Sequence, residues 1–241
     1  MDAVSVSRPR RRPEAKPFRF FDLPAELRLK ILDFVLVLPN TIDLDPDNYR
    51  YVAPRLRLFL VSHRMHLEAA ACFFGSNTFR IFPIHGRFFH TKKPLLVRLS
   101  PRYRAFIKTI ELRLGPGWTK PPKCWVVDAR LGLGEMTKGR LLKIFVECDP
   151  ASDEIFEGFR AGQDFYTFFC KDLVQNVLEQ VPSLAEVQFD AYPSVTKGSP
   201  LMQALISEGR ARHKRITYGP LRGWRGTDIG KAMAALRIAA P

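Results

Sequence analysis

The feature that most constrains the fold is a repeated exchange between strand-like and helix-like patterns in the second half of the chain. The strand-like stretches are FIKTIELRL (106–114), LLKIFVEC (141–148), LAEVQFDAY (184–192) and KRITYGP (214–220), the last being typical of an edge strand. Helical patterns cover 165–181, which ends at Pro182, and 201–213. Strands that alternate with helices predict α/β units with a partly parallel sheet.

The first half of the chain is helical in pattern. Residues 18–38 are helical in pattern, and Pro24 suits the first position of a helix. Glu26 then lies in the first turn, where a carboxylate is favoured by the helix dipole. Residues 40–53 are acidic and turn-rich, which is typical of a connecting loop. A second helix is expected over 54–74, followed by a short strand in NTFRIF (77–82).

The first helix carries more apolar residues than one buried face needs. At 100° per residue, one face holds Leu27, Ile31, Phe34, Val35 and Leu38, and we expect it to pack against the helix's own domain. A second apolar stripe lies almost opposite, formed by Leu29, Leu32 and Leu36. Either the C-terminal region or a partner protein must cover this second stripe, and geometry alone favours the cover within the chain.

The charge is large and unevenly distributed. The formal net charge is +14, yet residues 144–190 hold ten of the 24 acidic residues, whereas 55–143 hold 18 Lys and Arg against four acids. Such basicity indicates a nucleic-acid or acidic-protein partner, with a solvated basic surface as the alternative. The residues that we expect to contact such a partner are Trp118, Trp125, Trp224, Arg210, Arg212, Lys214 and Arg215. Phe165, Phe168, Phe169 and Val174 are instead expected to form a buried helix face.

Other features bear on the cellular setting. Residues 1–17 combine three prolines with five Lys and Arg, which favours a disordered basic tail, and RPRRRP is compatible with nuclear import. The four separated cysteines are typical of reduced thiols, not of a disulfide framework. No stretch approaches the ~18 apolar residues of a membrane span. We expect a protein of the nucleus or cytoplasm with no membrane partner.

No catalytic pattern is recognisable, so we expect no enzyme, cofactor or metal site. His63 and His66 are neighbours on a helix, but no third ligand has suitable spacing, which favours a packing role. Gly132 to Gly139 lacks the spacing of a phosphate-binding loop and is typical of a turn. An enzymatic or ligand-binding α/β domain without a sequence motif stays open as an alternative.

Two segments resemble a known family. LPAELRLKIL resembles the start of an F-box, whose pattern is matched by Leu23, Pro24, Glu26, Leu27, Ile31 and Val35. LFLVSHRMHLEAAACFFGSNTFRI is similar to the second half of F-box-like modules of filamentous fungi, with matches at Val61, Ser62, His66, Glu68, Ala69, Phe73, Phe74, Asn77, Thr78 and Phe79. The resemblance covers 18–82, about a quarter of the chain, and the acidic segment 39–55 makes its two halves lie farther apart than in an ordinary F-box.

The resemblance implies a small helical module that docks onto the Skp1 adaptor of a cullin-based ubiquitin ligase. The adaptor-facing or module-core candidates that it implies are Leu23, Pro24, Leu27, Ile31, Leu32, Leu36 and Val61. The expected organisation is thus a basic tail (1–17), an F-box-like helical module (18–82) and a mixed α/β recognition domain (83–241) that recruits an unknown protein substrate. The alternative is a basic nucleic-acid-binding protein acting in the nucleus.

Overall fold

The computed structural model describes residues 18–151, 162 and 164–224, and every statement below concerns these residues. The basic tail expected over 1–17 lies outside them. The α-helices are α1 (Ala25–Leu36), α2 (Pro46–Arg55), α3 (His63–Ser76), α4 (Leu95–Arg98), α5 (Pro101–Arg104), α6 (Phe165–Gln180) and α7 (Pro200–Ala211). The strands are β1 (Thr78–Arg80), β2 (Thr109–Leu114), β3 (Leu141–Val146), β4 (Glu186–Ala191) and β5 (Arg215–Tyr218). The short 3-10 helices are η1 (Phe20–Asp22), η2 (Leu56–Leu60), η3 (Gly86–Phe88), η4 (Ala129–Leu131) and η5 (Leu133–Glu135).

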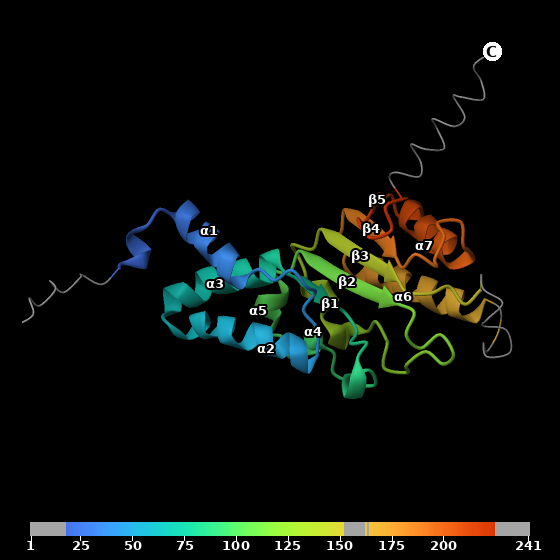
Figure 1. Cartoon of the computed structure of the whole chain (residues 1–241), viewed down its shortest axis with the longest axis horizontal. Helices are drawn as coiled ribbons and strands as arrows, with labels where there is room; N and C mark the ends of the chain where they lie inside the picture. Colours follow the sequence, from blue (N-terminus) through green and yellow to red (C-terminus); the bar gives the residue numbers. More distant parts are fainter. Residues whose placement is uncertain (1–17, 152–161, 163, 225–241) are drawn as a thin grey trace, which may run out of the picture.

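The strands form one five-stranded sheet whose order, β1-β2-β3-β4-β5, is the order of the chain (Figure 1). Each neighbouring pair is parallel, so the mixed α/β fold is confirmed and its sheet is more regular than the sequence predicted. β5 lies at the edge, as its pattern indicated. Because parallel crossovers are right-handed almost without exception, a sheet built in chain order receives its connecting segments on one face.

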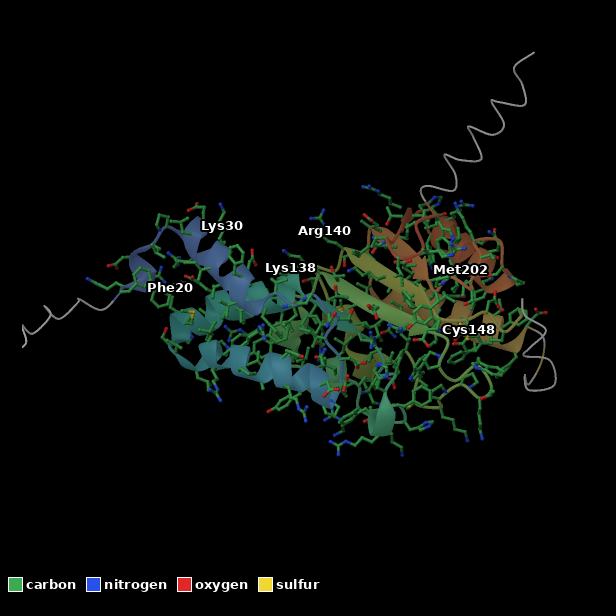
Figure 2. All side chains as sticks on the ribbon, viewed as in Figure 1. Phe20, Lys30, Lys138, Arg140, Cys148 and Met202 are labelled. Carbon is green, nitrogen blue, oxygen red and sulfur yellow. The ribbon has the colours of Figure 1, made fainter. Side chains whose placement is uncertain are left out.

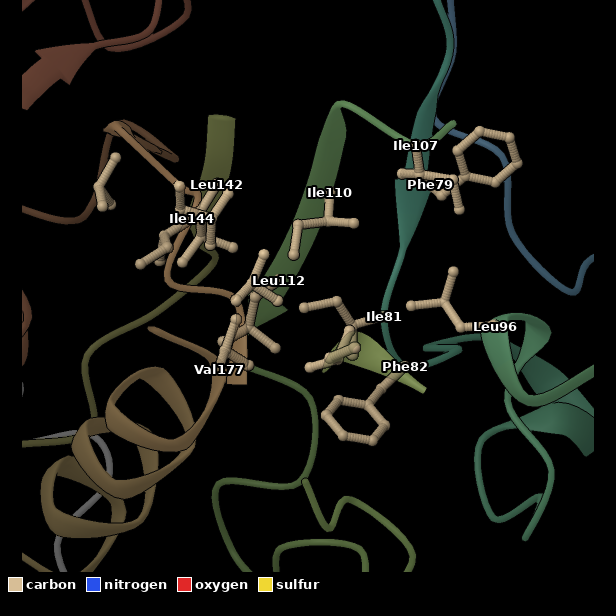
Figure 3. Close-up of a cluster of buried hydrophobic side chains, with 14 of the residues drawn as sticks. Phe79, Ile81, Phe82, Leu96, Ile107, Ile110, Leu112, Leu142, Ile144 and Val177 are labelled. Atoms are coloured by element: carbon tan, nitrogen blue, oxygen red, sulfur yellow. The ribbon is translucent and has the colours of Figure 1, made fainter. Parts of the chain in front are cut away.

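The two faces of the sheet differ in burial. Along β2, β3 and β4, every second side chain is buried and those between are half-buried. Figure 3 shows the buried face, where Ile110, Leu112 and Ile144 form one cluster with Val177 of α6. β3 therefore has one fully buried face and one half-buried face, although its continuous apolar run is typical of a strand buried on both faces.

The helical region is held together by polar contacts as well as by apolar packing. α1 packs on α3, and Arg28 of α1 donates from Nε and Nη2 to the two carboxylate oxygens of Glu68 at 2.9 Å each. The buried Asn77 side chain donates to the carbonyl oxygens of Leu36 and Phe73, and its Oδ1 accepts from the Leu38 amide. These contacts fix the end of α1 against the end of α3.

Two expected helix boundaries in this region were wrong. The acidic segment expected to be a loop contains α2, because Asp45 caps its first turn by accepting from the Asp47 amide and Pro46 occupies its first position. The helix expected over 54–74 is interrupted, because Ser62 has an extended backbone and accepts from the Met65 amide as the N-cap of α3.

The pairing of Arg28 with Glu68 makes stability depend on pH. The hydrogen bonds from Arg28 hold the pKa of the Glu68 carboxyl below its ordinary value of 4.5. A lowered folded-state pKa stabilises the fold above that ordinary value, and this contribution is lost as the pH falls below it. We expect the melting temperature of the wild type to fall more steeply below about pH 4.5 than that of Glu68→Gln. Equal slopes for the two proteins would contradict this role.

The helical region and the sheet share one hydrophobic core. Ile42, which follows α1, forms a parallel bridge to Phe79 of β1, and its amide donates to the Thr78 carbonyl oxygen at 2.8 Å. Phe74 of α3 stacks on Phe79 and on Tyr103, with ring centroids 5.6 and 4.7 Å apart. β1, which the sequence analysis placed in the N-terminal module, is the first strand of the sheet, so residue 82 does not separate two independent cores.

Candidate docking surface

A row of exposed apolar side chains covers the outer face of α1. Leu27, Ile31 and Val35 are each 40% exposed or more, and Phe34 is 90% exposed. Their spacing along α1 places them on one face. The end of η2 and the residue after it add Leu60 and Val61, which are 85% and 64% exposed. We call these six residues the apolar docking surface.

The part of this surface between α1 and η2 is hollowed. A groove of about 520 Å³ is lined by Phe34 and Val35 of α1, Pro54 and Arg55 of α2, and Arg57, Leu58 and Val61. Arg55 positions its rim, because its Nε donates to the Val35 carbonyl oxygen at 2.8 Å and thereby ties the end of α2 to α1. The groove therefore combines an apolar floor with two guanidinium groups, which suits an apolar anchor flanked by carboxylates.

The prediction for the first face of α1 was wrong, because the face expected to pack inside, which includes Leu27, Ile31 and Phe34, is exposed. The second stripe is covered within the chain at Leu32 and Leu36, as geometry favoured, whereas Leu29 is 47% exposed. Arg28 explains why this stripe is the buried one, because it lies on it at a spacing of four residues from Leu32. A charge on a face normally marks it as exposed, but this charge is paired with Glu68, forty residues away in sequence.

The residues implied by the family resemblance separate into two groups. Pro24, Leu27, Ile31 and Val61 are exposed, and Leu23 is half-buried with its carbonyl oxygen accepting from Arg28. Leu32 and Leu36 are 1% and 0% exposed, so they belong to the core and cannot contact a partner.

Sequence reasoning missed three members of the docking surface. Phe34 and Val35 were assigned to the core face, and Leu60 was placed inside a continuous helix. The serine at 62, which caps α3, was the signal that could have separated Leu60 from that helix, since Ser is a strong N-cap residue. For Phe34 the sequence held no such signal, because both stripes of α1 are apolar.

The aromatic residues expected to contact a partner or to form the core are placed differently. Trp125 and Trp224 are each 2% exposed, so their expected role as exposed contacts was wrong. Trp125 stacks on Phe82 at 5.4 Å, while Trp118 is half-buried. Phe165 and Phe168, expected to be buried, are exposed instead, because α6 buries the face that carries Tyr166, Cys170, Leu173, Val174, Val177 and Leu178.

The basic residues near the C-terminal end of the described chain are partly engaged. Arg212 donates to Glu179 Oε1 at 2.8 Å and also pairs with Glu208. Arg215 lies 4.0 Å from Glu186 Oε2, and Lys214 Nζ donates to the Pro182 carbonyl oxygen. Arg210 is exposed. These contacts reduce the positive charge that this region offers to a polyanion.

The residues with potential for catalysis have structural partners. His66 lies with Nδ1 3.1 Å from the Phe59 carbonyl oxygen and Nε2 2.9 Å from the Tyr103 hydroxyl. The cysteines are free, and burial raises the pKa of the Cys148 thiol to about 11 and that of Cys72 to about 12, which disfavours the nucleophilic thiolate. Within the described ranges no group of three His, Cys, Asp or Glu side chains could hold a metal ion.

The comparisons with known proteins give no match. No family model, no curated protein and no solved structure is significantly similar to this chain. Among the described residues, no helix has both the length and the apolar character needed to cross a bilayer. The apolar docking surface is the most pronounced binding feature of the helical region.

Proposed function

We propose that this protein is an interaction adaptor, a substrate receptor of a Skp1-cullin-F-box ubiquitin ligase. Its helical region would dock onto a Skp1-like protein, and its α/β region would hold the protein to be modified. The observation that carries the proposal is the apolar docking surface, in which large aliphatic and aromatic side chains lie together in water. Exposed apolar patches of this kind are typical of protein interaction sites.

The composition of the surface supports a protein partner. Burying apolar area releases about 25 cal/mol per Å², so covering Phe34 and its neighbours offers a substantial driving force. Leu27, Ile31 and Val61, which the F-box resemblance implies as adaptor-facing or module-core candidates, belong to this surface. The groove beside Phe34 provides a concave site for an apolar anchor, the usual position of an interface hot spot.

The nucleic-acid alternative has weaker support. Base stacking requires an exposed aromatic face, and Trp125 and Trp224 are buried. Arg212 and Arg215 already face carboxylates. Arg210 is an exposed cation near the C-terminal end of the described chain, but Trp125 and Trp224 are not exposed beside it to stack on bases.

The Skp1 interaction can be tested with purified proteins. We expect the full chain to bind recombinant Skp1 and the Leu27→Asp/Ile31→Asp variant to bind roughly 100-fold more weakly, since two interface anchors are each worth about 1–2 kcal/mol. Leu29→Asp is the matched control, because Leu29 is exposed on α1 but lies on the other side of the buried stripe. Calorimetry measures the dissociation constants.

Either of two outcomes would reject the proposal: the wild type does not bind Skp1, or the Leu27→Asp/Ile31→Asp variant binds Skp1 as tightly as the wild type does. Equal weakening by Leu29→Asp would show that added charge, and not the apolar docking surface, is responsible. Circular dichroism of each variant confirms that α1 remains folded.

A further inference from the structure

A second hollow lies far from the docking surface, at the carboxyl end of the sheet. It has a volume of about 1030 Å³ and is formed by the segments that follow β1 and β2, between Phe89 and Val97 and between Gly117 and Leu131. In open sheets of parallel strands, ligands bind beyond the carboxyl ends of the strands, where the connecting loops diverge. The cavity lies at this edge of the sheet, beyond β1 and β2. Because the strand order never reverses, the chemistry of its lining and not its position indicates the ligand.

Most of the charged side chains that line the cavity are cations. The charged or titratable side chains around it are His90, Lys92, Lys120, Lys123, Asp128 and Arg130. Arg130 lies 3.4 Å from Asp128, whereas none of the three lysines pairs with a carboxylate within the described part of the chain. Figure 2 shows nitrogen-tipped side chains extending outward from the loops around η3. Unpaired lysines on facing loops favour an anionic ligand.

The remaining walls are apolar. Val126 is 53% exposed and Val97 is half-buried, whereas Pro122 and Leu131 line the cavity from buried positions. A free inorganic anion would use only the lysines and leave Val126 in water. A ligand that fits the whole cavity carries both negative charge and an aliphatic group.

The surroundings distinguish between two kinds of polyanion. A nucleic-acid strand needs a continuous basic track and an aromatic face for stacking. Here Trp125 is buried, and Phe89 is packed edge-on against His90 and Trp125. The strand end next to β2 carries Glu147, which pairs with Arg113, and the buried Asp149, so these two residues add no positive charge to the track. The three lysines of the cavity lie in the segments that follow β1 and β2.

We propose that this cavity binds an acidic peptide segment of a partner protein, with an aliphatic residue of the segment against Val97 and Val126 and its carboxylates near Lys92, Lys120 and Lys123. The site is separate from the apolar docking surface, so a protein that fails to bind Skp1 can still bind the peptide. The lysines would set the rate of encounter and its salt dependence, and the aliphatic contact would set the selectivity.

The test measures fluorescence anisotropy with the full chain and a labelled oligoglutamate peptide that has one central leucine. We expect the Lys92→Gln/Lys120→Gln/Lys123→Gln variant to bind about tenfold more weakly, since three surface charges together are worth on the order of 1–2 kcal/mol. The matched control removes as much charge elsewhere through Arg210→Gln, Lys214→Gln and Arg215→Gln, and its affinity should stay within about twofold of the wild type. Thermal melts verify that both variants fold.

Two further probes make the proposal specific. A peptide with glycine in place of the leucine should bind more weakly to the wild type, and this difference should shrink in Val126→Ser. Oligothymidylate of the same length and label should bind more weakly than the peptide. The proposal is overturned if oligothymidylate binds as well or better, if leucine gives no advantage, or if the peptide does not bind at low salt.

Discussion

Replacing Arg80 with alanine is expected to lower the free energy of unfolding by about 3–5 kcal/mol, because removing one partner of a buried ion pair leaves uncompensated charge. Arg80 of β1 donates from Nε and Nη2 to Glu111 Oε1 at 3.0 and 2.8 Å, and from Nη1 to Asp43 Oδ2 at 2.8 Å. Its side chain is 9% exposed, and that of Asp43 is 4% exposed. The guanidinium therefore joins the segment after α1 to the first two strands, and chemical denaturation measures its loss.

The pH dependence of the stability of Arg80→Ala provides a second test of the role of Arg80. Burial raises the pKa of the Asp43 carboxyl above its ordinary value of 3.8, although Arg80 acts in the opposite direction. Without the guanidinium, that pKa rises further. A raised folded-state pKa favours the fold at low pH and loses this effect as the pH rises through it. The Arg80→Ala variant should therefore recover part of its stability on mild acidification.

A variant that neutralises the whole cluster serves as the control. Asp43→Asn/Arg80→Met/Glu111→Gln should lose less stability than Arg80→Ala alone, because it leaves no buried charge without a partner. A loss below about 1 kcal/mol for Arg80→Ala would show that the two carboxylates are solvated in the variant. In that case the cluster does not hold the helical region to the sheet.

Leu32 and Phe34, two residues apart on α1, should respond in opposite ways to truncation. Leu32 is 1% exposed, and Leu32→Ala is expected to lower the free energy of unfolding by about 2–5 kcal/mol through the cavity that it leaves. Phe34 is 90% exposed, and Phe34→Ala should change the same quantity by less than about 0.5 kcal/mol. Denaturant titrations of both variants measure the contrast.

For Skp1 binding, we expect Phe34→Ala to have a large effect although its effect on stability is small. Phe34→Ala removes a large side chain from the apolar docking surface, so it should weaken Skp1 binding although the protein stays as stable as the wild type. If Phe34→Ala destabilises the fold as much as Leu32→Ala does, the outer face of α1 is packed within the chain. The surface would then not be available to a partner.

The sequence predicted the elements of the sheet better than it predicted the faces of the helices. Each strand had a local signature, such as the alternation at Ile110, Leu112 and Leu114, and these stretches form β2 to β5 as expected. A half-buried strand is indicated by the alternation of apolar and polar residues, which can be recognised within one short segment of the sequence. Strand order and the fully parallel pairing depend on the whole chain, so the pattern predicted them only in part.

The position of the docking surface could not be predicted from α1 alone. Arg28 is tolerated in the interior only because Glu68 on another helix neutralises it, and no local rule announces that pairing. Trp125 illustrates the same limit, since its Pro- and Lys-rich surroundings are typical of an exposed loop while its ring is covered by Phe82. Long-range contacts decided both cases.

A sheet whose spatial order equals its chain order also affects how the protein can be made. Each strand after β1 pairs with the one synthesised just before it, so its first partner is already made when it emerges. Domains form N-terminal parts first during translation, and early pairing shortens the time for which strand edges stay open. Proteolysis of translation products stalled at increasing lengths should show protection advancing from β1 to β5. The helical region that carries Phe34 and Val61 would then already be in place while the last strand is still within the ribosome.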